Sequence, residues 1–278
     1  MAAVALTQSR LLGCDFSSSP TARKNIVLAW GAWRDKRLVL ENLQACDSLL
    51  AFEQALHTPG PWVGGFDLPF GLPRELITQL NWPSQWKPCI AHFASLTREQ
   101  IRQTFKSFCD ARPEGGKFAH RATDLPAGSS PSMKWVNPPV AYMLHAGLPL
   151  MLQAGLDFPG LHSGDKQRVA LEAYPGWLAR KLIGSRSYKS DDKAKQTAER
   201  LIARKDILQG LVSGQGGVTL YLRPAQHDAV VADASGDKLD AVLCMVQAAM
   251  AQQCHEQGDM RYGLPTDMDT LEGWITGV

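Results

Sequence analysis

The chain has 278 residues, enough for one large domain or two small ones with a sizeable hydrophobic core. Hydrophobic residues make up 45% and charged residues 20%, which is the balance of an ordinary globular protein. The formal net charge of +2 is too small to indicate nucleic-acid binding by itself. Any basic surface must therefore come from local clustering of charge.

The six cysteines are scattered, and no pair has the Cys-x-x-Cys spacing of a zinc knuckle or a redox motif. They are Cys14, Cys46, Cys89, Cys109, Cys244 and Cys254. We expect reduced, buried thiols. The segment MAAVALTQSRLLG lacks the basic start and apolar core of a signal peptide, and no stretch approaches the roughly 20 apolar residues of a membrane span. The prediction is a cytoplasmic protein.

The N-terminal quarter predicts a strand meander, a helix and a further strand. Three short apolar runs separated by polar turns form the meander: 10–16, 25–33 and 37–46. Segment 47–58 begins with Asp47 as a capping residue and carries apolar residues at helical spacing. Segment 62–73 is an apolar strand interrupted by Asp67 and closed by Pro69. After the crossover, this fourth strand can lie parallel to the first.

The rest of the chain is mostly helical in pattern. We predict helices at 96–111, 140–155, 190–212 and 235–254. Segment 112–139 is a long loop rich in Gly, Pro and Ser, and loops of that length are usually functional or partly disordered. Segment 167–184 predicts a strand that ends at Glu172, a turn begun by proline, and a short helix. We find no repeat and no linker, which favours a single domain of residues 1–278 with a helical and loop insertion at about 74–166.

Acidic residues stand where the apolar elements end or begin. Asp15 ends the first predicted strand, Asp67 interrupts the fourth and Glu172 ends the fifth. Asp237 and Asp240 lie in the first turn of the last predicted helix. In an open α/β sheet, the carboxyl ends of strands form the crevice where ligands bind. Carboxylates gathered at one place repel one another. Two Mg²⁺ or Mn²⁺ ions, which take oxygen ligands, remove this electrostatic repulsion.

Each of these acids also has a structural interpretation. Asp15 fits a turn with the serines that follow it, Asp67 fits a turn before Leu-Pro, and Glu172 fits a solvated strand end. Asp237 is a natural first-turn acid that the helix dipole stabilises. We therefore prefer Asp240 to Asp237 as a metal ligand.

Five segments taken together point to a known family. They are GCDFS, GGFDLPFGLP, ALEAYPGWL, YKSDDKAKQTAERLIAR and SGDKLDAVLCMVQAA. From about Leu11 to Ala249 the chain resembles the domain-of-unknown-function-429 family, whose members are predicted nucleases of the ribonuclease H-like superfamily. The resemblance implies an α/β fold with a mixed five-stranded sheet, in which an antiparallel meander joins parallel strands and helices flank the sheet.

The resemblance also implies which residues hold two Mg²⁺ or Mn²⁺ ions and perform catalysis. The implied ligands are Asp15, Asp67, Glu172 and Asp240, with Asp237 as a competitor for the last place. Both Asp67 and Glu172 fall at strand ends, so which of them fills the second acidic position stays open. An Arg-x-x-Asp pair that recurs in the family matches Arg121 and Asp124, although a surface loop tethered by one ion pair is the simpler explanation.

Basic residues gather between positions 186 and 205, where seven of them face three acids. Lys193, Arg200 and Arg204 are spaced for one helical face, which could hold the phosphates of a nucleic acid. A solvated helix with ion pairs is an equally good interpretation. Lys189 precedes this helix and is a further candidate for binding the substrate, as is Arg121.

The leading hypothesis is a metal-dependent nuclease, in which water attacks a phosphodiester of DNA or RNA between two metal ions. Asp15 would bridge the ions, and Lys189 and Arg200 would steady the scissile phosphate. One alternative is a non-catalytic module with the same fold that binds nucleic acid or protein and whose acids are structural. A less favoured alternative is an actin-like or sugar-kinase-type ATP-binding protein, because the chain carries one copy of the fold and no Gly-rich phosphate loop.

Overall fold

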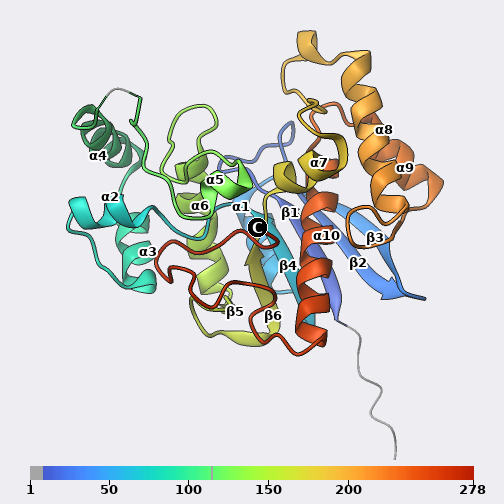
Figure 1. Ribbon diagram of the computed structural model, residues 1–278, viewed down its shortest axis with the longest axis horizontal. Coiled ribbons are helices and arrows are strands. Elements are labelled where there is room, and N and C mark those ends of the chain that lie inside the picture. Colours follow the sequence, from blue (N-terminus) through green and yellow to red (C-terminus); the bar gives the residue numbers. More distant parts are fainter. Residues whose placement is uncertain (1–8, 114) are drawn as a thin grey trace, which may run out of the picture.

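A computed structural model describes residues 9–113 and 115–278, and its centre is a mixed seven-stranded sheet (Figure 1). The spatial order of the strands is β5-β6-β4-β1-β2-β3-β7. The strands are β1 (Arg10–Asp15), β2 (Ile26–Arg34), β3 (Arg37–Cys46), β4 (Trp62–Asp67), β5 (Leu156–Asp157), β6 (Asp165–Glu172) and β7 (Leu220–Tyr221). The expectation that the chain carries no signal peptide falls largely on residues 1–8, outside the described residues.

Helices cover both faces of the sheet. They are α1 (Leu49–Leu56), α2 (Arg74–Gln79), α3 (Trp86–Ser95), α4 (Arg98–Asp110), α5 (Asp124–Ala127), α6 (Val140–Gln153), α7 (Pro175–Ile183), α8 (Ala198–Val212), α9 (Pro224–Ala232) and α10 (Asp237–Glu256). A single 3₁₀ turn, η1 (Lys193–Lys195), precedes α8. Helices α2, α3 and α4 lie at one end of the molecule, and α8 and α9 lie at the other (Figure 1).

The antiparallel meander β1–β2–β3 and the parallel pairing of β1 with β4 confirm the topology predicted for the N-terminal part. Strand β6 then pairs parallel with β4. The sheet has two strands more than the five we expected, because β5 and β7 join its edges. Each of these edge strands is two residues long, too short to show a period of two in the sequence.

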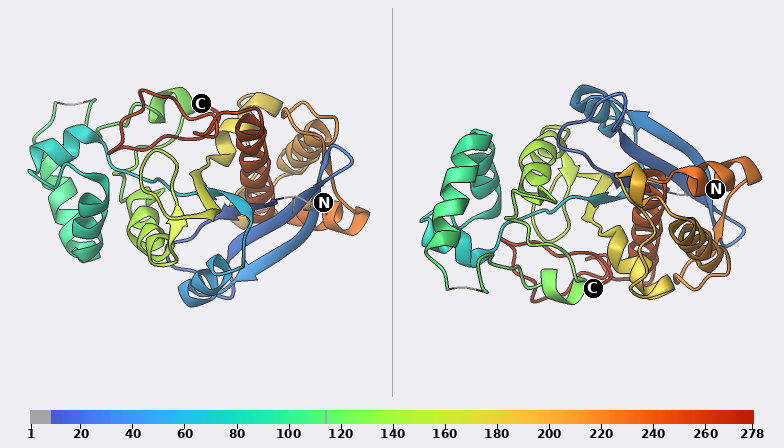
Figure 2. Two further views of the ribbon diagram at one scale, coloured as in Figure 1. Left: turned by 90° about the horizontal axis from the view of Figure 1, so that it is seen from below. Right: turned by 90° about the horizontal axis from the view of Figure 1, so that it is seen from above.

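Side chains that alternate along the central strands divide the core into two layers. Leu12 and Phe66 point into a cluster with α1, α3 and α6. Leu11 and Val63 point to the other face, where they pack with α7, α8 and α10. Figure 2 shows α10 lying along one side of the sheet, with α7 and α8 beside it. This two-sided burial explains why the central strands read as continuous apolar runs.

Four details differ from the sequence prediction. Helix α1 is capped by Ser48, whose hydroxyl accepts a hydrogen bond from the Ala51 amide at 3.2 Å, and not by Asp47. Strand β4 ends at Asp67, where the chain turns before Pro69, so it does not continue to residue 73. The helix predicted at 190–212 begins only at Ala198. The sequence predicts no individual helix at α2, α3, α5 or α9, although the first three fall within the predicted helical and loop insertion at about 74–166.

Among residues 9–113 and 115–278, no helix has the length and apolar character needed to cross a membrane.

Candidate functional site

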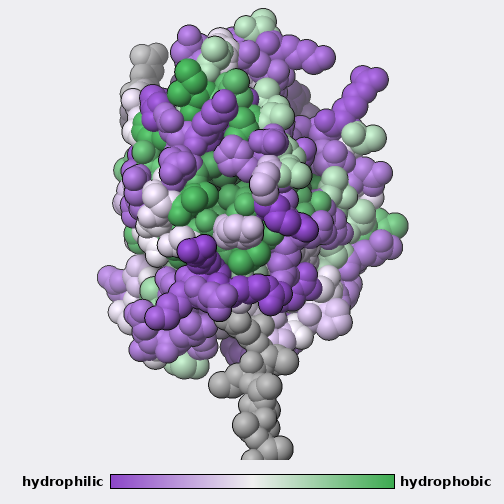
Figure 3. Space-filling model, turned by 90° about the vertical axis from the view of Figure 1, so that its right-hand side faces the viewer, coloured by the Kyte–Doolittle hydropathy of each residue, from purple (hydrophilic) through white to green (hydrophobic). Residues whose placement is uncertain are grey.

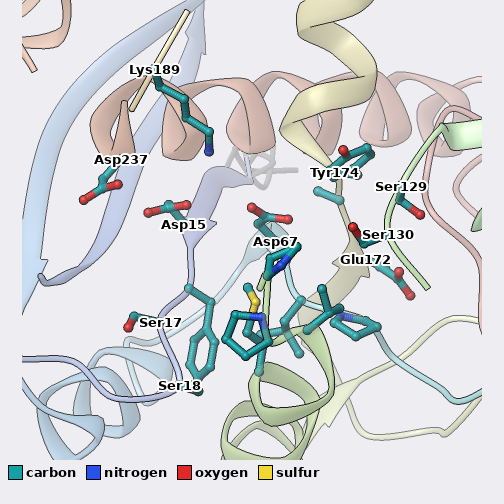
Figure 4. Close-up of a pocket in the computed structure, with 18 of the residues that line it drawn as sticks. Asp15, Ser17, Ser18, Asp67, Ser129, Ser130, Glu172, Tyr174, Lys189 and Asp237 are labelled. Carbon is teal, nitrogen blue, oxygen red and sulfur yellow. The ribbon is translucent and has the colours of Figure 1, made fainter. Parts of the chain in front are cut away.

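A pocket of about 540 Å³ opens where β1, β4 and β6 end and α10 begins. The three strands run parallel to one another, so their carboxyl ends meet at the same edge of the sheet. Figure 4 shows the carboxylates of Asp15, Asp67 and Asp237 around one side of this space, with Lys189 reaching toward them. The loop at 129–139 and the start of α6 close the opposite side.

Asp15 and Asp67 are direct partners in the parallel ladder between β1 and β4. Asp15 is 8% exposed, and Asp67 is half-buried. Both side chains point into the pocket (Figure 4). Within the part of the chain that the structure describes, no donor lies at hydrogen-bond distance from either carboxylate. Asp15 is thus almost fully removed from water and Asp67 partly so, and neither has a protein donor, which disfavours the charged form of each.

The first turn of α10 brings two more carboxylates to the pocket. Asp240 is fully buried and accepts a hydrogen bond from the Tyr188 hydroxyl at 2.6 Å, and it also pairs with the Lys189 ammonium. Asp237 is 3.0 Å from the Lys24 ammonium. Both carboxylates on α10 are thus already paired with a lysine, whereas those on the strands are not.

Glycines bring α10 close enough for these acids to meet. A Cβ atom added to Gly13 would lie 1.9 Å from the Ala241 carbonyl oxygen, and one added to Gly65 would lie 2.4 Å from that of Cys244. The helix backbone consequently rests directly on β1 and β4, two residues before the strand-end aspartates. The sequence encodes this close approach with residues that have no side chain.

Burial and mutual repulsion change the acid–base properties of the group. Burial, with repulsion from Asp240, raises the pKa of Asp15 well above its usual value. Burial also raises the pKa of Asp67 to about 7, even though Lys189 opposes the rise. Partial loss of water works against the Lys189 ammonium, but attraction to Asp240, Asp15 and Asp67 raises its pKa well above the usual value. The site has more negative than positive charge, and an added cation would reduce the repulsion among its carboxylates.

Glu172 ends β6, as the sequence predicted, but it belongs to the other face of the sheet from Asp15 and Asp67. Its ladder partner is Phe66, and residues paired in a ladder share a face of the sheet. Glu172 therefore belongs to the face opposite α10. Both of its oxygens accept hydrogen bonds from the Arg121 guanidinium, at 2.6 and 2.8 Å, and one also accepts from the Phe70 amide at 2.8 Å. Glu172 lines the pocket, but its carboxylate is already engaged on both oxygens.

Arg121 is likewise engaged within the protein. It is 3% exposed and holds both Glu172 and Asp124, the latter at 2.9 Å. The pairing of Arg121 with Asp124 is therefore a buried ion-pair network and not the tether of a surface loop. A guanidinium used in this way fixes the insertion against the end of β6 and leaves little capacity for a phosphate.

The basic residues expected on one helical face are separated in the structure. Lys193 is exposed on η1, and Arg200 lies on α8 and donates to the Lys195 carbonyl. Arg204 is buried, and donates to the Val231 and Tyr188 carbonyls at 2.8 Å each. The shared face was a wrong prediction, because the helix begins after Lys193 and Arg204 points inward. Figure 3, from the side of α8 and α9, shows hydrophobic residues exposed among hydrophilic ones.

Sequence reasoning missed Lys24 and Tyr188. Lys24 lies between β1 and β2 and reaches Asp237 and Asp191. Tyr188 donates to Asp240 from the segment before α8. Tyr188 begins one of the segments that carry the family resemblance, and Lys24 lies in none of them, but the sequence shows for neither residue which carboxylate it contacts.

The donor set suits Mg²⁺ or Mn²⁺, since it consists of carboxylate oxygens, two of them without a hydrogen-bond donor. As they stand, however, the side chains of residues 9–113 and 115–278 include no group of three or more His, Cys, Asp or Glu placed to hold an ion. The donor types fit such an ion, and the carboxylates would have to close around it. Comparisons of the chain with protein-family models, with curated proteins and with solved structures find no match.

Proposed function

We propose that the chain is a metal-dependent nuclease with a ribonuclease H-like fold that hydrolyses phosphodiesters of DNA or RNA. The observation that carries the proposal is the pair of carboxylates, buried Asp15 and half-buried Asp67, that lie side by side without donors at the edge of a parallel sheet. Carboxylates that share a site in this way are stabilised by hard divalent cations.

The order of the strands supports the same fold. An antiparallel meander, β3-β2-β1, continues into the parallel strands β4 and β6, and a late helix, α10, packs over β1 and β4. This is the arrangement that the resemblance to ribonuclease H-like nucleases implies. The acids lie on the first strand, the fourth strand and the late helix, as that resemblance also implies.

We assign the metal-binding role to Asp15, Asp67, Asp237 and Asp240. We leave Glu172 out of this set, because Arg121 engages both of its oxygens. Two bound Mg²⁺ or Mn²⁺ ions would supply a water of lowered pKa and charge stabilisation for the leaving oxygen.

The lysines and the tyrosine have the supporting roles. Lys189 and Lys24 now neutralise the two carboxylates on α10, and once cations do so, both ammonium groups become available to a phosphate. The Tyr188 hydroxyl holds one oxygen of Asp240 in place. Lys193 and Arg200 are the remaining candidates for contact with a nucleic-acid backbone, since Arg121 and Arg204 are buried.

One observation favours the alternative of a non-catalytic module that binds nucleic acid or protein. Asp237 and Asp240 are already paired with lysines, as they would be in a protein whose acids are structural. Nothing in the described residues adds support to the less favoured ATP-binding alternative.

Calorimetric titration with Mn²⁺ tests the proposal without any assumption about the substrate. The wild type should bind Mn²⁺, and Asp15→Asn should lose binding together with Mn²⁺-dependent cleavage of fluorescent DNA and RNA oligonucleotides. Asp228→Asn, on the exposed surface of α9, is the matched control and should bind and cleave like the wild type. Cleavage that survives Asp15→Asn would overturn the assignment. Wild-type protein that binds oligonucleotides, but does not bind Mn²⁺ and does not cleave them, would favour the binding module.

A further inference from the structure

The pocket has two chemically different halves. One half carries the carboxylates with Lys24 and Lys189. The other half is built by apolar side chains: Phe16, Leu68, Pro139, Val140 and Met143. Figure 4 shows carbon-rich side chains beyond Asp15 and Asp67, on the side away from Lys189.

The apolar half comes from elements that also position the acids. Phe16 directly follows Asp15, and Leu68 directly follows Asp67; both are largely buried in the core layer with α1 and α6 and also line the pocket. Val140 and Met143 lie on the first turn of α6, in the insertion, and both are partly exposed. The insertion thus places a hydrophobic wall beside the proposed metal site.

A phosphodiester backbone alone does not account for this wall. Phosphates and sugars present charge and hydroxyl groups, which hydrophobic side chains do not satisfy. The faces of a nucleobase are apolar and pack well on such side chains. A volume of about 540 Å³ lies within the roughly 300–1,000 Å³ typical of small-molecule sites, which is room for one nucleotide unit.

We propose that the wall formed by Phe16, Leu68, Pro139, Val140 and Met143 binds one unpaired base of the substrate while the attached phosphate lies at the carboxylates. This inference rests on the proposed function and specifies its substrate as a nucleotide unit with an unpaired base. Such a unit is supplied either by single-stranded nucleic acid or by a free nucleotide. A duplex would have to unpair and unstack the base before it could enter.

Hydroxyl groups at the edge of the pocket suit the polar parts of the same unit. Ser17 and Ser18 lie beside the end of β1, and Ser130 lies in the loop across from them (Figure 4). All three are partly exposed, and each hydroxyl can donate and accept. A sugar hydroxyl or the edge of a base would find partners there without displacing the hydrophobic contact.

The test compares ligands that differ only in the base. Calorimetry in the presence of Mn²⁺ should give at least tenfold tighter binding of dAMP or dTMP than of 2-deoxyribose 5-phosphate, which lacks only the base, or of inorganic phosphate. Met143→Gln should weaken nucleotide binding at least fivefold and leave the affinities for phosphate and Mn²⁺ unchanged. Met260→Gln, at a methionine that is 75% exposed outside the pocket, is the control and should change none of these affinities.

Oligonucleotides then distinguish the two sources of the nucleotide. Under the same conditions, a decamer dT10 that binds more tightly than dTMP identifies single-stranded nucleic acid as the ligand, and tighter binding of dTMP identifies a free nucleotide. The dT10·dA10 duplex should bind at least tenfold more weakly than dT10.

Three results would overturn the inference. They are equal affinities for nucleotide and phosphate, equal weakening of both by Met143→Gln, and duplex binding as tight as that of dT10. Failure of the proposed function is recognised separately, because wild-type protein would then not bind Mn²⁺. The comparison of dTMP with 2-deoxyribose 5-phosphate in metal-free buffer would still decide whether the wall binds a base.

Discussion

Asp15 and Asp67 are direct ladder partners at the ends of two parallel strands, and both point toward the face of the sheet that α10 covers. The two carboxylates have no donor among the described residues, and burial raises the pKa of each. Folding therefore brings together two groups that resist ionisation. This relationship makes the stability of the protein depend on pH in a direction that can be measured.

The first prediction concerns pH. Because the folded state raises the pKa of Asp67 from its usual value near 4 to about 7, protonated Asp67 favours the folded state. The free energy of unfolding should fall as pH rises from about 4 through about 7 in metal-free buffer. Asp67→Asn should flatten this dependence. It should also stabilise the protein at pH 8 by about 2 kcal/mol, half of what the full shift would give, because the side chain is partly solvated.

Urea unfolding at pH 5 and pH 8 checks this prediction. Asp228→Asn, whose carboxylate is 84% exposed, should keep the pH dependence of the wild type. An Asp67→Asn variant that is less stable than the wild type at pH 8 would mean that the carboxylate has a stabilising partner in solution.

The second prediction concerns metal and stability. If Mn²⁺ binds the folded protein at Asp15 and Asp67, a free concentration of 100 times the dissociation constant should raise the free energy of unfolding by about 2.7 kcal/mol. The increase should be larger at pH 8 than at pH 5, since protons compete with Mn²⁺ for the carboxylates. Thermal unfolding with and without Mn²⁺ measures it. An equal increase in Asp67→Asn would place the ion elsewhere.

The acids at the strand ends could be predicted from the sequence, but the face of the sheet to which each one points could not. Side chains alternate along a strand, so Asp15 lies on the side of Leu11, and Asp67 on the side of Val63. Glu172 also ends a strand, yet its ladder partner Phe66 places it with the opposite face. That register depends on how β6 pairs with β4 across about a hundred residues of chain, which no local pattern encodes.

The same limit applies to the basic residues. The meander, the parallel fourth strand and the last helix follow from long apolar patterns, and these predictions are confirmed. Arg204 has the spacing of a surface residue, but its guanidinium is buried because the Val231 and Tyr188 carbonyls need donors. A residue that satisfies backbone groups of distant segments looks no different in the sequence from one that faces solvent.

The third prediction separates the ion-pair network from the metal site. Arg121→Met removes the partner of two buried carboxylates, Asp124 and Glu172, and should destabilise the protein by about 3–5 kcal/mol. Glu172→Gln keeps the shape of the side chain and one of its two acceptor oxygens, and should cost less. If Glu172 is not a ligand, the Glu172→Gln variant should bind Mn²⁺ with the affinity of the wild type. Urea unfolding and calorimetry measure the two effects, and loss of Mn²⁺ binding in Glu172→Gln would return this residue to the metal-binding set.

The fourth prediction tests whether close packing of α10 on β1 sets the geometry of the site. A methyl group at Gly13 would overlap the Ala241 carbonyl and the Met245 backbone, so α10 must move outward. Gly13→Ala should therefore lower the free energy of unfolding by about 3 kcal/mol, the cost of overpacking a well-filled core. The outward movement also separates Asp240 from Asp15, so Mn²⁺ affinity should fall at least tenfold at temperatures where the variant is still folded.

Gly116→Ala is the matched control for this prediction, because the nearest atom to its added methyl group would lie 3.9 Å away. It should change neither stability nor Mn²⁺ affinity. Circular dichroism establishes the temperature range in which Gly13→Ala is folded, and calorimetry within that range gives the affinity. A folded but destabilised Gly13→Ala that binds Mn²⁺ as tightly as the wild type would show that the strand-end pair, Asp15 and Asp67, holds the ion without the carboxylates of α10. The site would then belong to the sheet alone, and the glycine would matter only for packing.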